Sequence, residues 1–174
     1  MQSQMNLKIK FRESFRPFAP SVLSERASEY FEMEHESPYM LLVERVQSDR
    51  RIEMTDQEQV LWGIEMLNVP RSDIPAVTHV DYSARVHTVS QEKNPLYHDL
   101  IRHFDDLTGC GVVVNTSFNV RGEPIVCTPA EAYHCFMGTH MDVLAVGNFL
   151  LHKKEQPKSK LVPTESYISQ FEMD

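Results

Sequence analysis

Cysteine is scarce in this sequence, and long hydrophobic runs are missing altogether. Its three cysteines, Cys110, Cys127 and Cys135, form neither an even set nor a CxxC pair, which indicates reduced thiols rather than a disulfide framework or a structural zinc site. The apolar runs are too short to cross a membrane, and residues 1–13 lack the apolar core of a signal peptide. We therefore expect a cytoplasmic protein.

Basic charge is also in the minority. With 17 Lys and Arg against 25 Asp and Glu, the formal net charge is -8, which argues against broad, nonspecific nucleic-acid binding. The distribution is uneven, because Lys8, Lys10, Arg12 and Arg16 stand close together against Glu13 alone. Such a stretch can attract a small anion or can be an ordinary solvated face, and composition leaves both interpretations open.

Spacings that signal covalent or metal-dependent catalysis are missing as well. The eight histidines show no HxxxH or HExxH arrangement, so we expect no metal site in this chain. Ser117 lacks the flanking glycines of a GxSxG elbow. We therefore do not interpret it as a nucleophile.

The composition is that of one soluble α/β domain. The 174 residues are 41% hydrophobic and 24% charged, enough to bury a core. An Asn-Pro pair at 94–95 and a capping box with proline at 128–131 mark two helix starts. The hydrophobic spacing predicts helices over residues 25–31, 55–70, 95–108 and 129–137, and strands over residues 40–46, 76–80, 84–89, 112–114 and 143–152.

Several local patterns give finer expectations. The alternation at residues 7–12 predicts a half-buried strand or extended arm with its cations on one side. Pro17 and Pro20 exclude a central strand, so residues 15–22 should form an ordered loop. Residues 76–80 and 84–89 should pair as a hairpin, and Trp62 should pack in the core. The polar composition beyond residue 153 predicts a weakly held tail.

The rest of the chain is organised around residues 111–126, GVVVNTSFNVRGEPIV. Three valines suit a strand buried on both faces, which then turns polar. The following loop mixes amide, guanidinium and exposed backbone at Asn119, Arg121 and Gly122, and that mixture suits an oxyanion or phosphate. The alternative is a buried strand with an ordinary solvated turn.

Three stretches in order, KFRESFRPFAP at 10–20, VDYSARVHTV at 80–89 and NTSFNVRGEPIVCT at 115–128, resemble one family. It is the C-terminal domain of the carbamoyltransferases that include the NodU type and the enzymes that carbamoylate tobramycin and cephamycins. The resemblance covers roughly residues 5–153. It implies a carbamoyltransferase C-terminal domain over 1–153 with a tail at 154–174, and a YrdC-like twisted open mixed β-sheet with flanking helices.

The resemblance also implies roles for individual residues. The YrdC-like signature falls on Lys10 with Arg12 and on Ser117 with Asn119. Catalytic roles would belong to Lys10, Arg12 and Arg121. Contacts with substrate or nucleotide would come from Arg16, Arg85, Asn115, Thr116, Ser117 and Asn119, with no metal ligand in this chain.

The implied chemistry is the formation of carbamoyl-adenylate from carbamoyl phosphate and ATP, with Mg²⁺ accompanying the nucleotide. An N-terminal domain of the same enzyme, which this chain lacks, would hold Fe²⁺ or another metal and pass the carbamoyl group to an acceptor hydroxyl. Full transfer is therefore not expected from this chain alone. The sequence suggests no membrane partner and leaves a homodimer open.

Two other functions remain open: a non-catalytic YrdC-like module that binds RNA or a partner chain, and a scaffold for the other half of an enzyme. The catalytic hypothesis makes a geometric prediction. The ammonium of Lys10 and the amide of Asn119 should come face to face at one end of a β-sheet.

Overall fold

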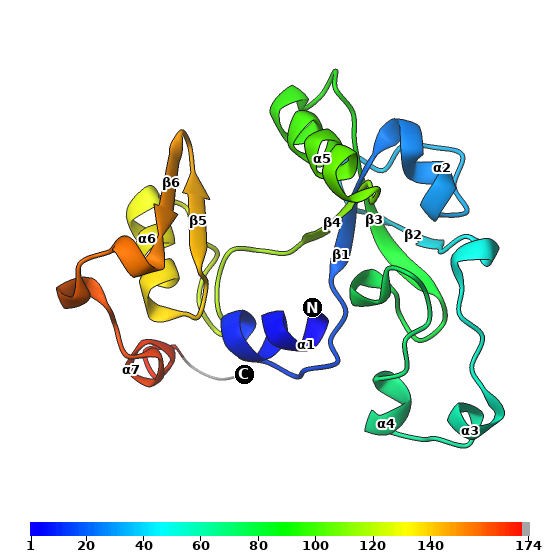
Figure 1. The fold of residues 1–174 in the computed structure, drawn as a ribbon, viewed down its shortest axis with the longest axis horizontal. Helices are drawn as coiled ribbons and strands as arrows, with labels where there is room; N and C mark the ends of the chain where they lie inside the picture. Colours follow the sequence, from blue (N-terminus) through cyan, green and yellow to red (C-terminus); the bar gives the residue numbers. More distant parts are fainter. Residues whose placement is uncertain (172–174) are drawn as a thin grey trace. The chain divides into compact units, whose positions relative to one another are not determined.

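The computed structural model describes residues 1–171, which fall into two compact units (Figure 1). Unit 1 joins both ends of the sequence, Met1–Arg16 and the residues from Ser117 onward, and unit 2 is the intervening segment Pro17–Thr116. Residues far apart in sequence therefore share a unit.

Unit 2 is built on a mixed four-stranded sheet. Its strands are β1 (Ala19–Leu23), β2 (Leu42–Arg45), β3 (Ser83–Val89) and β4 (Val112–Asn115), in the order β2-β3-β1-β4. Strand β1 runs parallel to β3, whereas β4 pairs with β1 and β2 pairs with β3 in antiparallel fashion. The mixed sheet and its helices confirm the predicted α/β class.

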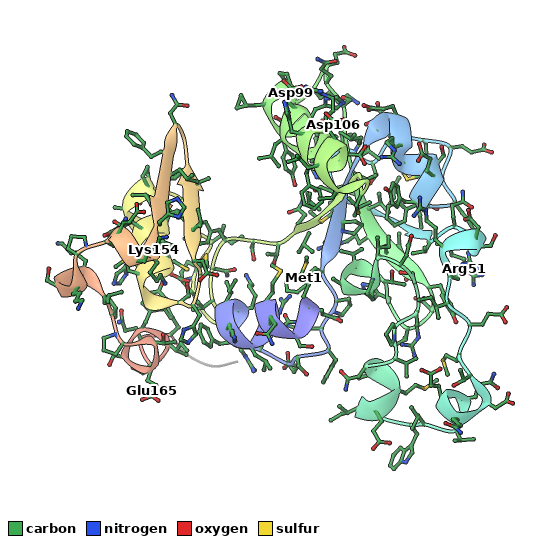
Figure 2. All side chains as sticks on the ribbon, viewed as in Figure 1. Met1, Arg51, Asp99, Asp106, Lys154 and Glu165 are labelled. Atoms are coloured by element: carbon green, nitrogen blue, oxygen red, sulfur yellow. The ribbon has the colours of Figure 1, made fainter. Side chains whose placement is uncertain are left out.

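Helix α5 (Pro95–Thr108) packs against this sheet and begins and ends as its sequence predicts. The side chain of Asn94 caps the first turn at 3.3 Å, and Gly109 ends the helix with a φ of 73° that favours glycine. Ile101 on the inner face is fully buried against Leu23. Figure 2 labels two charged residues of this helix, Asp99 and Asp106, whose side chains are exposed.

The loop predicted at residues 15–22 is wrong, because Pro20 lies inside the central strand β1. Pairing with β3 begins at Ser21, whereas Pro20 is registered with Val114 of β4. Pro20, which lacks a backbone N–H, therefore lies before the first residue that pairs with β3. The pairing of β1 with β3 remains intact.

The hairpin predicted between residues 76–80 and 84–89 is also wrong in its first half. Pro75–Val77 is a short 3-10 helix, and β3 pairs with β2 and β1 instead. A proline at the first helical position favours that turn over an extended strand. Other short helices of unit 2 are 3-10 turns at Ser24–Arg26 and Ser48–Arg50 and helix α2 at Ala27–Tyr30.

The long helix predicted over residues 55–70 is interrupted. Its capping box is present, but α3 covers only Asp56–Gln59 and α4 only Ile64–Leu67. Gly63 separates them with a φ of 61°. Trp62 is 84% exposed, so the predicted core role is wrong. Two four-residue helices are too short to carry a continuous apolar stripe.

Unit 1 contains helices from both ends of the chain and one hairpin. Its elements are α1 (Gln2–Met5), a π-helical turn (Asn6–Lys10), α6 (Pro129–Gly138), β5 (Val143–Val146), β6 (Phe149–His152), 3-10 turns at Lys153–Glu155 and Lys158–Lys160, and α7 (Thr164–Ile168). The capping box and proline predicted at the start of α6 are present. The single strand predicted at 143–152 is instead a hairpin, turning at Gly147 with a φ of 55°.

The strand predicted near the N-terminus is wrong, because residues 2–10 are helical. On a helix, Asn6 and Lys10 lie on one face and are buried, while Leu7 is 56% exposed. The alternation at residues 7–12 is too short to distinguish period two from helical spacing. The two cations Lys8 and Lys10 therefore do not lie on the same side of the chain, as they would on a strand.

Two expectations based on composition can be compared with the structure. The three cysteines are free thiols, as predicted. Among the helices of residues 1–171, none combines the length and hydropathy needed to span a bilayer.

Candidate functional site

The N-terminal helix places Lys10 and fixes the chain that follows it. The helix stops at Phe11, which has a left-handed φ of 51°. The buried Asn6 amide donates to the carbonyl oxygens of Ser14 at 3.1 Å and Arg16 at 2.8 Å, and its Oδ1 accepts from Arg12 Nε at 2.7 Å. Asn6 thus ties both arginines to the helix that bears Lys10, a role that sequence analysis missed.

Lys10 is buried, with 4% of its surface exposed, and its ammonium is held by neutral oxygens. Nζ donates to the Ser117 carbonyl at 2.8 Å, to the Asn119 carbonyl at 2.7 Å and to Asn119 Oδ1 at 2.8 Å. The three N–H donors of an ammonium therefore have three good acceptors. The structure brings the predicted Lys10, Ser117 and Asn119 together.

The loop at residues 117–123 is held by its own polar groups. Ser117 Oγ donates to Asn119 Oδ1 at 2.7 Å, and Asn119 Nδ2 donates to the Glu123 carbonyl at 2.7 Å. The Val120 N–H donates to the Glu123 carboxylate at 2.7 Å. Gly122 supplies the turn with a φ of 77°. This bonding fixes the acceptors that surround the lysine.

Three guanidinium groups come from the same two segments. The Arg121 side chain lies 3.7 Å from the Glu13 carboxylate, and Arg16 lies 3.8 Å from it. The Arg121 N–H also donates to the Lys10 carbonyl at 3.1 Å. With Arg12, the cluster contains four cations and two carboxylates, those of Glu13 and Glu123, so its formal charge is positive.

Burial and mutual repulsion lower the pKa of two cations of this cluster, Lys10 and Arg12. Burial, followed by the nearby charge of Arg12, lowers the pKa of Lys10 from 10.5 to about 8. Burial, followed by the charge of Arg16, lowers the pKa of Arg12. The pKa of the Glu13 carboxyl is lowered, first by a hydrogen bond with its own backbone and then by the surrounding arginines. An anion entering here would relieve the repulsion among the cations.

The remaining predicted residues belong to unit 2 and have contacts of their own. Arg85 is exposed on β3, and Thr116 is half-buried just after β4. Asn115 Nδ2 donates to Ser21 Oγ at 2.9 Å. The residues that surround Lys10 all belong to unit 1, whereas the four-stranded sheet belongs to unit 2.

A second polar cluster crosses three strands of that sheet. Ser21 Oγ lies 2.8 Å from His87 Nδ1, and Asn115 Nδ2 lies 3.2 Å from the same nitrogen. Burial lowers the pKa of His87, which favours its neutral form. Sequence analysis placed His87 on the correct strand but did not connect it to Ser21, because pairing between distant strands is not visible in the sequence.

Unit 2 also has a cavity of about 400 Å³ that contains none of the predicted site residues. Three glutamates, Glu25, Glu34 and Glu36, lie in its lining. That acidity does not suit a phosphate ligand. Across residues 1–171, no group of three His, Cys, Asp or Glu side chains is placed to hold a metal ion.

The sheet of unit 2 and the buried lysine cluster of unit 1 define an α/β protein with a cationic site. The family model for the carbamoyltransferase C-terminus matches residues 1–153. The chain therefore belongs to that family, as its three motifs predicted.

Several relatives support this assignment. The chain is 58% identical over all 174 residues to the uncharacterized protein sll1178 of Synechocystis sp., covering 28% of that protein. It is 39% identical over 156 residues to nodulation protein NolO of Bradyrhizobium diazoefficiens, an alignment covering 88% of this chain and 25% of the relative. It is 37% identical over 119 residues to 3'-hydroxymethylcephem-O-carbamoyltransferase of Amycolatopsis lactamdurans, covering 68% of this chain and 19% of the relative. The chain thus spans about a quarter of the length of these curated relatives.

Proposed function

We propose that the Lys10 cluster binds carbamoyl phosphate and ATP and promotes the formation of carbamoyl-adenylate. The observation that carries this proposal is the buried Lys10 ammonium, whose acceptors are neutral oxygens and whose charged neighbours include Arg12. The positive charge is thus only partly neutralised within the protein. Each charged hydrogen bond to a phosphate oxygen would contribute roughly 1.5–3 kcal/mol.

The proposed reaction separates into hydrolysis, adenylation and transfer. Water cleaves carbamoyl phosphate to carbamate and inorganic phosphate. A carbamate oxygen then attacks the α-phosphorus of ATP, which forms carbamoyl-adenylate and expels pyrophosphate. The acceptor hydroxyl, bound elsewhere in a longer enzyme, attacks the carbamoyl carbon, loses its proton and releases AMP.

The residues of the site suit the adenylation step. Phosphoryl transfer needs positioned reactants and neutralised charge more than a side-chain nucleophile. Arg12 and Arg121 would hold the phosphate oxygens. Lys10, whose three N–H donors already bond to the loop, would contribute its positive charge, and Ser117 would keep Asn119 in place. Such donors suit the phosphate oxygens of a nucleotide. Mg²⁺ would arrive with the nucleotide and neutralise part of its charge.

The experiment is an assay of the chain with carbamoyl phosphate and MgATP. We expect pyrophosphate release that requires carbamoyl phosphate, with carbamoyl-adenylate detected by mass spectrometry. Arg121→Gln should lower the rate about 10- to 100-fold, the equivalent of one charged hydrogen bond. Arg102→Gln is the matched control, because Arg102 pairs with Asp99 and Asp106 on the exposed face of α5.

Two outcomes would contradict the proposal. One is the lack of pyrophosphate release together with the lack of MgATP binding. The other is binding of RNA that strengthens with oligonucleotide length and falls steeply with salt, since that behaviour belongs to a nucleic-acid module.

A further inference from the structure

Helix α7 buries one tyrosine in unit 1, although the composition of residues 154–171 predicts a weakly held tail. The Tyr167 side chain is completely buried and belongs to the same apolar cluster as Val120 and Cys135. The His134 ring meets it edge-on, with 5.0 Å between ring centroids. A single aromatic anchor thus holds a polar segment in place, and average composition does not reveal such an anchor.

The backbone of α6 is shaped to receive this ring. A Cβ atom built on Gly138 would lie 2.4 Å from Cγ of Tyr167. That distance is far shorter than any normal carbon contact, so only glycine allows the ring to lie this close to the helix. The ring position is therefore fixed by close packing.

The hydroxyl group of Tyr167 connects this anchor to the candidate site. It donates to one oxygen of the Glu123 carboxylate, while the other oxygen accepts the Val120 N–H at 2.7 Å. The Glu123 carbonyl accepts from the Asn119 amide at 2.7 Å, and the Asn119 Oδ1 accepts from Lys10 at 2.8 Å. A continuous series of hydrogen bonds therefore joins α7 to the buried ammonium.

We propose that residues 154–171 form a strap in which Tyr167 is a positioning residue, holding Glu123 and hence the 117–123 loop in the geometry that binds the anion. The inference rests on the proposed function for its effect on ligands. The strap lies beyond the family match, which ends at residue 153, whereas the alignment with the Synechocystis protein extends over all 174 residues.

The negative charge of Glu123 explains why the anchor is a tyrosine rather than a phenylalanine. A carboxylate close to a cationic cluster competes with any incoming anion for the same donors. The phenol and the Val120 amide occupy both of its oxygens and hold it beside α7. Without the hydroxyl, one oxygen of the Glu123 carboxylate loses its donor while the other still accepts from the Val120 amide, so the carboxylate is held less firmly beside α7.

The decisive variant is Tyr167→Phe, which keeps the packed ring and removes the hydrogen bond. Tyr133→Phe is the matched control, because its hydroxyl bonds to Gln156 of the strap at 3.1 Å without touching the loop. We expect Tyr167→Phe to weaken MgATP and carbamoyl phosphate binding about tenfold, as loss of one charged hydrogen bond implies. Tyr133→Phe should remain within twofold of the wild-type chain.

A double-mutant cycle shows whether Tyr167 acts through Glu123. In a Glu123→Ala background the hydroxyl has lost its bond to the loop and keeps only its contact with Cys135, so Tyr167→Phe should cause little further loss of affinity. Equal losses in both backgrounds, or equal losses for Tyr167→Phe and Tyr133→Phe, would overturn the inference.

Hydrogen-deuterium exchange provides a test that needs no ligand. Tyr167→Phe should speed exchange at the amides of Val120 and Arg121, and Tyr133→Phe should not. Unchanged exchange in the loop refutes the positioning role. Faster exchange in a chain that binds neither ligand refutes the proposed function and leaves the strap in place, so the two failures can be distinguished.

Discussion

The Lys10 ammonium donates two hydrogen bonds to Asn119, at 2.7 Å to its carbonyl and at 2.8 Å to its side-chain oxygen, although 109 residues separate them in sequence. A buried charge thus connects the N-terminal helix to the loop after β4. Under the proposed function, a change in the lysine or its acceptors should affect both stability and anion binding.

Removing the Asn119 amide should destabilise the chain. Asn119→Ala takes one acceptor from a buried ammonium, and an unsatisfied buried group costs about 1–3 kcal/mol. The measurement is the free energy of unfolding in urea. Asn68→Ala is the control, since Asn68 makes a comparable side-chain bond on the exposed surface of α4. Equal stability of the two variants would contradict the structural role of Asn119.

The depressed pKa of Lys10 predicts how stability depends on pH. The folded value is about 8 and the ordinary value is 10.5. Between these values the unfolded chain still holds the proton that the folded chain has lost, so stability rises with pH. The slope from this group is at most about 1.4 kcal/mol per pH unit. Below pH 8 both states are protonated, and the slope from this group vanishes.

The contribution of Lys10 is isolated by subtracting the unfolding free energies of Lys10→Met from those of the wild-type chain. This subtraction removes the contribution of groups whose titration does not depend on Lys10. The difference should be flat from pH 6.5 to 7.5 and should rise toward pH 9.5. A difference that stays constant throughout would show that the lysine pKa is ordinary.

The three thiols should differ in reactivity. Burial, followed by the charge of Glu123, raises the pKa of Cys135 to about 12, whereas Cys127 is exposed. Because the thiolate is the reacting form, iodoacetamide should modify Cys127 well before Cys135. Peptide mass spectrometry over time gives the order. Early labelling of Cys135 in the folded chain would show that α7 does not protect it.

The close packing of Tyr167 on Gly138 predicts a strongly coupled pair. Gly138→Ala should destabilise the chain by about 1–3 kcal/mol, because the added methyl group displaces the ring. The penalty should largely disappear in a Tyr167→Ala background, where the space is vacant. Urea unfolding of the two single variants and the double variant measures this coupling. Additive losses would indicate that the ring does not lie against this glycine.

Local sequence signals predicted the helices whose ends carry capping or terminating residues. Helix α5 lies between a capping Asn94 and a terminating Gly109, and helix α6 has a capping box followed by proline. These signals act over a few residues, so the sequence contains them completely. Motif resemblance likewise identified the family and the pair formed by Lys10 and Asn119.

Errors arose where tertiary context decides the outcome. Pro20 is compatible with a central strand only because pairing with β3 starts one residue later, and that register is set by a distant strand. The short alternation at residues 7–12 predicted a strand, but the chain there forms a helix that buries Asn6 with Lys10. Tyr167 was overlooked because its partner, Glu123, is 44 residues away and its segment is otherwise polar.

Calorimetric titration with MgATP tests the central claim most directly, comparing the wild-type chain with Lys10→Met and with Lys8→Met, which removes an exposed ammonium from the same helix. Arg12→Gln is included because it leaves the lysine and its bonds in place. We predict that Lys8→Met binds within twofold of wild type, while Lys10→Met and Arg12→Gln each bind about 10- to 100-fold more weakly. Wild-type affinity in both of the latter variants would contradict an anion site at Lys10.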